Sequence, residues 1–202
     1  MTGPDLTLEH AARARGALRV CGVDEVGRGP WAGPVTACAA ILRGPLPPGL
    51  DDSKKVSAKR RLAMEPWLRE CCLWSVGEAS VDEIDALGIR RATHLAMRRA
   101  VEGLGLRPDA ALVDGNDLPD LPCPGLPVVG GDGRSLSIAA ASVLAKTWRD
   151  RGMVARAQRH PGYGWETNMG YGTAAHRLGL QRHGVTQHHR RSFAPIHNML
   201  RR

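Results

Sequence analysis

The chain has 202 residues, of which 43% are hydrophobic and 24% are charged, and its formal net charge is +8. This length and composition suit one globular domain with a buried core, and they argue against a disordered or fibrous protein. Gly29–Leu42, the longest uncharged stretch near the N-terminus, is too short for a membrane helix, and the charged residues 1–17 are unlike a signal peptide.

The first part of the chain predicts an extension followed by two strands. We expect residues 1–18 to form an N-terminal extension that is partly flexible. The apolar runs Leu18–Val23 and Val35–Leu42 predict strands, and a turn rich in glycine and proline separates them. Prolines and glycines also predict a loop from Pro45 to Ser53.

The middle of the chain alternates helical and strand patterns. Ser57 is suited to cap a helix that runs through Glu70, although Pro66 lies within it. The short apolar run Leu73–Val76 predicts a strand. The spacing of Ser80 and Glu83 matches a capping box and predicts a helix that ends before Gly105.

Two more strands and two more helices follow. The apolar runs Ala110–Val113 and Leu126–Val129 predict strands, with a proline-rich loop between them. Ser135 is suited to cap a long helix over Leu136–Arg159, with a buried, alanine-rich first half and an exposed, basic second half. Thr173–Arg182 predicts a shorter helix that stops at Gly184.

This order of elements predicts an α/β fold, in which a mixed sheet is flanked by helices. Neither an internal repeat nor a linker divides the chain, so we expect a single domain over residues 19–202. We expect its core at about residues 19–160 and a helical, basic C-terminal segment at about residues 146–202.

The positive charge of the chain is concentrated in that C-terminal segment. Residues 146–202 hold eleven Lys or Arg and only two acidic residues, a balance of +9, whereas residues 1–145 have a balance of −1. Six of the eight histidines also lie in this segment. Such an asymmetry is typical of a surface that binds a polyanion, and a solvated basic helix face is the alternative.

The five cysteines form no CxxC pair and do not have the spacing of a zinc site. Their odd number argues against a disulfide framework. We therefore expect reduced, mostly buried thiols and a cytoplasmic protein.

Carboxylates follow the predicted strands at two places. Asp24 and Glu25 come directly after a buried run and precede a glycine-rich turn, and Asp114 closes the strand that begins at Ala110. Asp132 lies between glycines just before the long helix. Each acid alone is explained by a polar turn or by a favourable contact with a helix N-terminus.

Taken together, the four acids predict a metal site. Converging carboxylates repel each other and raise each other's pKa values, and a divalent cation bound through oxygen atoms relieves that repulsion. Two such ions can activate water and stabilise the leaving oxygen in a phosphoryl displacement. A basic segment elsewhere in the chain would hold the nucleic acid.

The chain resembles bacterial ribonuclease HII in several motifs that occur in the family's order. The first is Val23-Asp24-Glu25-Val26-Gly27-Arg28-Gly29-Pro30-Trp31-Ala32-Gly33-Pro34-Val35. The others are Asp52-Ser53-Lys54-Lys55, Val113-Asp114-Gly115, Ser135–Lys146 with Arg149-Asp150-Arg151, Tyr163-Gly164-Trp165, Gly170-Tyr171-Gly172-Thr173 and His189-Arg190-Arg191-Ser192-Phe193. The resemblance covers about residues 19–197, and seven motifs in order make a chance similarity improbable.

This resemblance implies a ribonuclease H-like fold and a metal-dependent endonuclease that uses Mg²⁺ or Mn²⁺. Its implied substrates are the RNA strand of RNA–DNA hybrids and duplex DNA with embedded ribonucleotides. It would cut such DNA on the 5′ side of each ribonucleotide. The products would carry 5′-phosphate and 3′-hydroxyl ends. Matching the motifs assigns Asp24, Glu25, Asp114 and Asp132 to the family's catalytic, metal-binding positions.

The resemblance also implies substrate-binding residues. The loop of Gly27, Arg28 and Gly29 matches the one whose backbone contacts the ribose 2′-hydroxyl, and Tyr171 matches an aromatic residue that packs on the sugar. Further candidates are Ser53, Lys54 and Lys146. Ser53 and Lys54 would alternatively form a capped turn, and Lys146 would alternatively pair with an acid on its own helix.

Two positions depart from the family pattern, because Gly130 and Met169 stand where lysine is usual. The loss would weaken phosphate contacts, and Arg134, Arg149 and Arg177 are candidates to compensate. We expect a monomer, and the sequence shows no sliding-clamp peptide.

Three alternatives remain open from the sequence. His188 and His189 would suit a zinc site, but they lack a cysteine or a second spaced pair. A structure-specific DNA nuclease of the same fold would use the same acids. A non-catalytic nucleic-acid-binding protein would explain the basic segment but not the acids.

Overall fold

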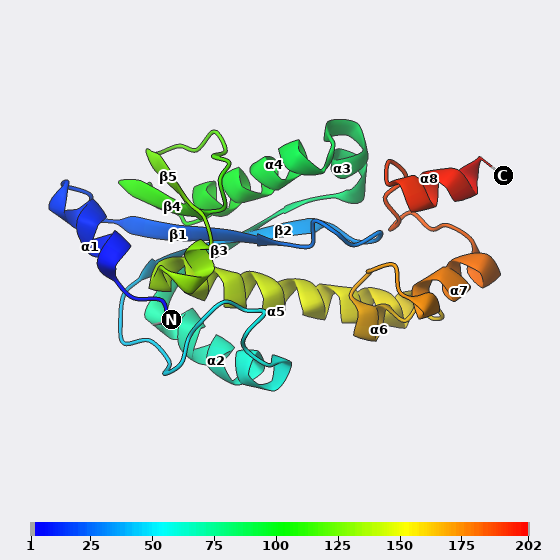
Figure 1. Cartoon of the computed structure of the whole chain (residues 1–202), viewed down its shortest axis with the longest axis horizontal. Helices are drawn as coiled ribbons and strands as arrows, with labels where there is room; N and C mark the ends of the chain where they lie inside the picture. Colours follow the sequence, from blue (N-terminus) through cyan, green and yellow to red (C-terminus); the bar gives the residue numbers. More distant parts are fainter. Residues whose placement is uncertain (1–2, 202) are drawn as a thin grey trace.

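A five-stranded mixed sheet forms the centre of the molecule (Figure 1). The computed structural model describes residues 3–201. The strands are β1 (Val20–Val26), β2 (Val35–Leu42), β3 (Cys72–Ala79), β4 (Ala110–Asp114) and β5 (Gly125–Val128). Their order in the sheet is β3-β2-β1-β4-β5; β1, β2 and β3 pair antiparallel, whereas β1, β4 and β5 pair parallel.

Helices cover both faces of this sheet. They are α1 (Thr7–Ala14), α2 (Ala58–Cys71), α3 (Val81–Leu87), α4 (Ile89–Glu102), α5 (Leu136–Arg159), α6 (Trp165–Asn168), α7 (Ala174–His183) and α8 (Ala194–Leu200), with a 3₁₀ turn η1 at Gly131–Gly133. One core lies between the sheet and α4, and the other between the sheet, α2 and α5. The predicted α/β fold with a mixed sheet flanked by helices is confirmed.

Helices α5 and α4 lie close to the sheet because glycines face them. A Cβ atom on Gly22 of β1 would lie 2.1 Å from the backbone carbon of Ser137 in α5. A Cβ on Gly77 of β3 would lie 2.2 Å from the carbonyl oxygen of Ala96 in α4. The close approach of α5 to β1 brings residues of that helix next to the end of the strand that carries Asp24.

The N-terminal extension contains a helix that the sequence analysis did not predict. Helix α1 sends the buried Glu9 side chain to the start of α5. Its Oε1 accepts hydrogen bonds from the hydroxyl groups of Ser135 (2.6 Å) and Ser137 (2.7 Å) and from the Ser137 backbone N–H (2.9 Å). A carboxylate at a helix N-terminus is stabilised by the unpaired N–H groups there, so this contact ties α1 to α5.

Several predicted elements differ in extent from those observed. Strand β1 runs over Val20–Val26 rather than Leu18–Val23, so Asp24 and Glu25 lie within it and not after it. The single helix predicted from Ser80 is two helices, because Gly88 between α3 and α4 has φ +77°, which an α-helix does not allow. The capping box of Ser80 and Glu83 is present. Strand β3 runs to Ala79, beyond the apolar run that predicted it, because it pairs with β2 along its whole length.

The C-terminal part of the chain extends from the far end of α5 as a group of short helices, α6 to α8 (Figure 1). Buried Tyr163, Trp165, Leu180 and Ile196 form its core with Met153 of α5. The helical C-terminal region that the sequence predicted is therefore present. Within residues 3–201, none of the helices has both the length and the apolar character needed to cross a membrane.

Candidate active site

Three of the four predicted acids meet at one edge of the sheet. Asp24 and Asp114 lie side by side because β1 and β4 are parallel neighbours and Val23 pairs with Val113. Asp132 comes from η1, whose Gly131 N–H donates a 2.6 Å hydrogen bond to Oδ1 of Asp114. One carboxylate oxygen from each aspartate lies within 4.8 Å of the other two.

Glu25 lies beside this cluster rather than within it. As the residue after Asp24 on a strand, it points to the other side, and its carboxylate forms an ion pair with Arg28 at 3.4 Å. Glu25, Arg28 and Asp114 line a cavity of about 190 Å³. Glu25 therefore faces Asp114 from the opposite side to Asp24.

The carboxylates strongly affect one another's protonation. Burial, then the charges of Glu25 and Asp114, raises the pKa of Asp24 well above its usual value. Burial, then Asp114 and Asp52, raises the pKa of Asp132 to about 6. The cluster therefore holds more negative charge than its protein surroundings neutralise, and its hard oxygen atoms suit a divalent cation such as Mg²⁺ or Mn²⁺.

The loop between β2 and α2 brings a lysine to the acids. Burial alone would lower the pKa of Lys54, but the carboxylates of Asp52, Asp24, Asp132 and Asp114 raise it. Ser53 is buried, and its hydroxyl oxygen accepts a 2.9 Å hydrogen bond from the hydroxyl of Ser142 in α5. The candidates Ser53 and Lys54 thus both lie near the cluster.

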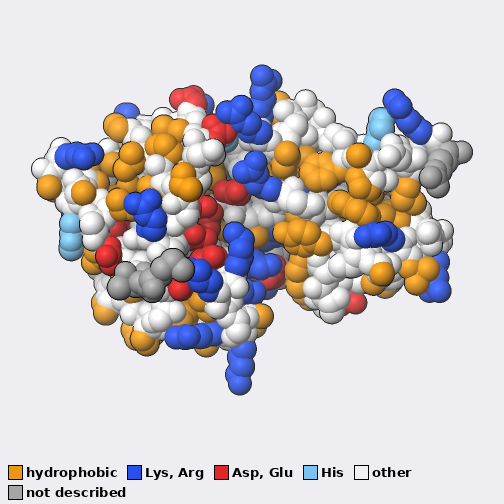
Figure 2. Space-filling view, in the orientation of Figure 1, with side chains coloured by type: hydrophobic (Ala, Val, Ile, Leu, Met, Phe, Trp, Pro, Cys, Tyr) orange, Lys and Arg blue, Asp and Glu red, His pale blue; other side chains and the backbone are white. Residues whose placement is uncertain are grey.

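Asp52 also faces Asp132. It belongs to one of the family motifs, but the sequence analysis did not predict it as a site residue. Figure 2 shows acidic side chains gathered in the middle of one face of the molecule, with Lys and Arg side chains beside them. A divalent cation and a phosphate backbone could therefore approach the same surface.

The glycine-rich loop and Tyr171 form a second part of the site. Arg28 and Gly29 are exposed, whereas Gly27 is buried with φ +91°. A Cβ atom on Gly29 would lie 3.3 Å from the ring of Tyr171, whose exposed fraction is 47%. The structure therefore brings a half-exposed Tyr171 together with Gly29 of the predicted substrate-binding loop.

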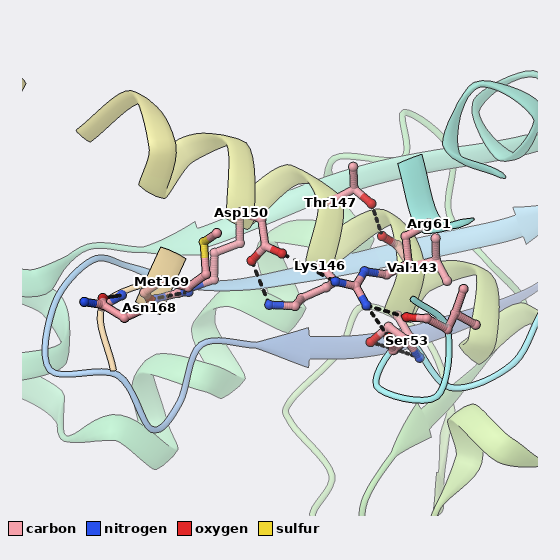
Figure 3. A network of polar contacts seen from close by, with 12 residues as sticks. Ser53, Arg61, Val143, Lys146, Thr147, Asp150, Asn168 and Met169 are labelled. Carbon is pink, nitrogen blue, oxygen red and sulfur yellow. Dashed lines mark hydrogen bonds and ion pairs between the residues drawn. The ribbon is translucent and has the colours of Figure 1, made fainter. Parts of the chain in front are cut away.

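Lys146 takes the second of its two predicted positions, paired with an acid on its own helix. Its Nζ donates to Asp150 at 2.7 Å, one turn along α5 (Figure 3). Arg61 lies 3.8 Å from the other oxygen of Asp150 and donates to the carbonyls of Ser53 (2.7 Å) and Val56 (2.6 Å). Lys146 is thus linked to the Ser53 loop through Asp150 and Arg61.

The three arginines that were expected to compensate for the missing lysines differ from one another in exposure. Arg149 is 2% exposed and donates only to backbone carbonyls, so the expectation that it compensates on the surface is wrong. Arg177 lies over the ring of Trp31 at 5.8 Å and is exposed, as is Arg134. Gly130 and Met169 both adopt left-handed backbone conformations, with φ +62° and +51°.

The histidines proposed as a zinc alternative pair with other side chains instead. Nε2 of His188 lies 3.1 Å from Nε2 of His160, and Nε2 of His189 lies 3.0 Å from Nε2 of His176. Within residues 3–201, the one group of three or more potential metal ligands is that of Asp24, Asp114 and Asp132. The geometry therefore favours a cation at the aspartates.

Comparisons with known proteins agree with this arrangement. Residues 21–196 match the family model described as ribonuclease HII. A ribonuclease HII from Paracoccus denitrificans is 62% identical and covers 99% of this chain and 96% of its own length. One from Jannaschia sp. is 60% identical and covers 98% of both chains.

The fold has counterparts among solved structures. Ribonuclease H2 from Pyrococcus horikoshii matches with a TM-score of 0.74 at 21% identity, over 90% of this chain and 97% of that one. This likeness confirms the predicted ribonuclease H-like fold. The match of the family model and the identity to its members show that this chain belongs to the ribonuclease HII family and is an endoribonuclease.

Proposed function

We propose that the protein hydrolyses the RNA strand of RNA–DNA hybrids and cuts duplex DNA on the 5′ side of embedded ribonucleotides. Its products would carry 5′-phosphate and 3′-hydroxyl ends. The observation that carries this proposal is one juxtaposition: Arg28 of the glycine-rich loop lines the same cavity as Asp114 of the carboxylate cluster, and Tyr171 lies against Gly29 of that loop. Membership of the family supports it.

The carboxylates supply the catalytic half of the site. Asp24, Glu25 and Asp114 would hold Mg²⁺ or Mn²⁺, and Asp132 would complete the site and orient the attacking water. Such ions, when bound, lower the pKa of water and stabilise charge on the leaving oxygen. Because burial and mutual repulsion raise the pKa values of Asp24, Glu25 and Asp132, the protein alone leaves negative charge there for a cation to neutralise.

The glycine-rich loop and Tyr171 would recognise the sugar of the substrate. The 2′-hydroxyl is the group that distinguishes RNA from DNA, and the backbone of Gly27, Arg28 and Gly29 can approach it closely because glycine has no side chain. Tyr171, half exposed beside Gly29, offers an aromatic face to the sugar. Lys54 would bind phosphate groups, and Lys146 would do so with the ammonium donors that Asp150 does not use. The basic C-terminal segment would contribute to affinity.

A cleavage assay tests this proposal directly. An end-labelled DNA duplex with one ribonucleotide is incubated with Mg²⁺, Mn²⁺ or a chelator, beside an all-DNA duplex. We expect a single cut on the 5′ side of the ribonucleotide, only with metal. Cutting of both duplexes would instead support the structure-specific DNA nuclease, and metal-independent binding without a product would support the non-catalytic alternative.

A further inference from the structure

Two arginines are buried beneath the glycine-rich loop without a carboxylate partner. Arg149 and Arg190 are 2% and 0% exposed. No ion pair within residues 3–201 includes either guanidinium. Burial lowers the pKa of Arg190 to about 9 and that of Arg149 to about 10, so both stay charged at neutral pH. A buried charge without a counterion is costly to keep unless backbone dipoles solvate it.

Arg190 directs its donors to the glycine-rich loop. It donates to the carbonyl oxygens of Gly27 (2.5 Å), Arg28 (2.8 Å), Gly33 (2.9 Å) and Pro34 (3.2 Å). The side chain therefore holds the start and the end of the segment that joins β1 to β2. All four acceptors are backbone groups, so this contact fixes peptide orientation rather than side-chain packing.

The orientation of two peptide planes follows from these bonds. In a trans peptide, the N–H points opposite to the C=O of the same plane. Because the carbonyls of Gly27 and Arg28 point inward to Arg190, the N–H groups of Arg28 and Gly29 point away from it. Both residues are exposed, and no acceptor among residues 3–201 hydrogen-bonds to either N–H. Two free donors therefore face outward side by side.

Arg149 joins the Tyr171 segment to the same frame. It donates to the carbonyls of Ala32 (3.3 Å), Pro34 (3.2 Å) and Met169 (3.0 Å). The N–H of Trp31 also donates to the carbonyl of Gly170 at 2.8 Å. The backbone on both sides of residue 28, and the backbone just before Tyr171, are thus fixed relative to one another.

We propose that Arg190 is a positioning residue for ribose specificity: it turns the N–H groups of Arg28 and Gly29 outward, where they donate to the 2′-oxygen of the substrate. Arg149 sets the distance between these donors and Tyr171. The guanidinium also polarises both peptide groups, which strengthens them as donors. This inference rests on the proposed function, and it assigns discrimination to a side chain that never touches the substrate.

The test compares Arg190→Lys with the matched control Arg191→Lys, both in the Asp114→Asn protein so that the substrate is not cut. Arg191 is the exposed neighbour of Arg190. Affinity is measured for a duplex with one ribonucleotide and for the all-DNA duplex of the same sequence. Lysine keeps the charge but lacks the planar fork that reaches several carbonyls.

We expect Arg190→Lys to reduce the ratio of the two affinities by about tenfold, the effect of one or two lost hydrogen bonds. Affinity for the all-DNA duplex should change by less than about twofold, and Arg191→Lys should leave the ratio unchanged. An equal loss of affinity for both duplexes would overturn the inference, because it would mean that Arg190 acts only through stability or charge.

A second measurement needs no substitution at Arg190 and therefore holds if that variant fails to fold. In ¹⁵N-labelled Asp114→Asn protein, the amide resonances of Arg28 and Gly29 should shift when the ribonucleotide duplex is added and not with the all-DNA duplex. Equal shifts with both duplexes would refute the inference. If the unsubstituted protein does not cut the ribonucleotide duplex at all, the proposed function itself fails, which separates the two outcomes.

Discussion

The carboxylate cluster and the arginines beneath the glycine-rich loop differ in how their charge is compensated. At the sheet edge, one carboxylate oxygen each of Asp24, Asp114 and Asp132 lies within 4.8 Å of the others, and Lys54 offsets only part of their repulsion. Beneath the glycine-rich loop, Arg149 and Arg190 are 2% and 0% exposed, and backbone carbonyls accept hydrogen bonds from their guanidinium groups. The first cluster needs an external ion, whereas the second uses its charge to hold the backbone. Buried charge thus marks a binding site only where the protein leaves it unsatisfied.

The largest expected effect on the cleavage rate comes from removing one charge of the carboxylate cluster. Asp114→Asn should reduce cleavage to less than about a thousandth of the unsubstituted rate, because a neutral amide holds a divalent cation poorly. The asparagine oxygen can still accept the N–H of Gly131, so the fold should remain intact. Cleavage rate and circular dichroism measure the two effects, and turnover at the unsubstituted rate would contradict the assignment.

Metal binding should stabilise the protein through the same cluster. A ligand at about 100 times its Kd stabilises the folded state by about 2.7 kcal/mol, which corresponds to a rise in Tm on the order of 5–10 °C for a domain of this size. Thermal melts with Mn²⁺ and with a chelator measure this rise. Asp24→Asn should abolish most of it, and a full rise in that variant would place the ion elsewhere.

The histidines of the C-terminal region should make the protein less stable in acid. Burial, then His176, lowers the pKa of His189 to about 3, and its Nδ1 accepts from the Thr186 N–H at 2.9 Å, so a proton there would face another donor. A histidine whose folded pKa is lowered binds fewer protons when folded, so stability should fall as the pH drops below about 6.5. Hydrogen exchange of residues 163–190 between pH 7 and 5 measures this loss.

Asp132 of the carboxylate cluster should change the pH dependence of stability in the opposite direction and more weakly. Asp132 has a folded pKa of about 6, above that of an unfolded aspartate, so the folded state binds the proton more tightly and this site favours folding as the pH falls from 7 towards 5. In metal-free protein, Asp132→Asn should remove that contribution and raise the stability at pH 7. A variant whose stability depends on pH as steeply as the unsubstituted chain would contradict this interpretation.

The acidic half of the site could be predicted from the sequence because two of its acids directly follow apolar strand residues. Asp24 and Asp114 follow apolar runs, and strands that pair in parallel bring such positions to one edge. The long helix was predicted with the bounds observed, since Ser135 and a change in composition mark its start. Local patterns are sufficient where a residue's role follows from its own element.

The rest depends on contacts between distant segments. Arg149 and Arg190 have the sequence surroundings of exposed residues, and only the folded loop supplies the carbonyls that bury them. Helix α1 is short, and its buried Glu9 is stabilised by Ser135 and Ser137, more than a hundred residues away. Periodicity and capping signals contain no information about such partners, so the sequence analysis expected Arg149 at the surface, gave Arg190 no role and predicted no helix before residue 18.

The contact of Glu9 with the start of α5 has a practical consequence for how the protein is handled. A shortened version that begins near residue 19 would keep every motif of the family, yet it would leave the first turn of α5 without the carboxylate that its N–H and hydroxyl groups now share. That turn directly follows Asp132 and begins the helix that carries Lys146 and Arg149. A segment outside every recognisable motif is therefore part of the framework on which the catalytic surface is built.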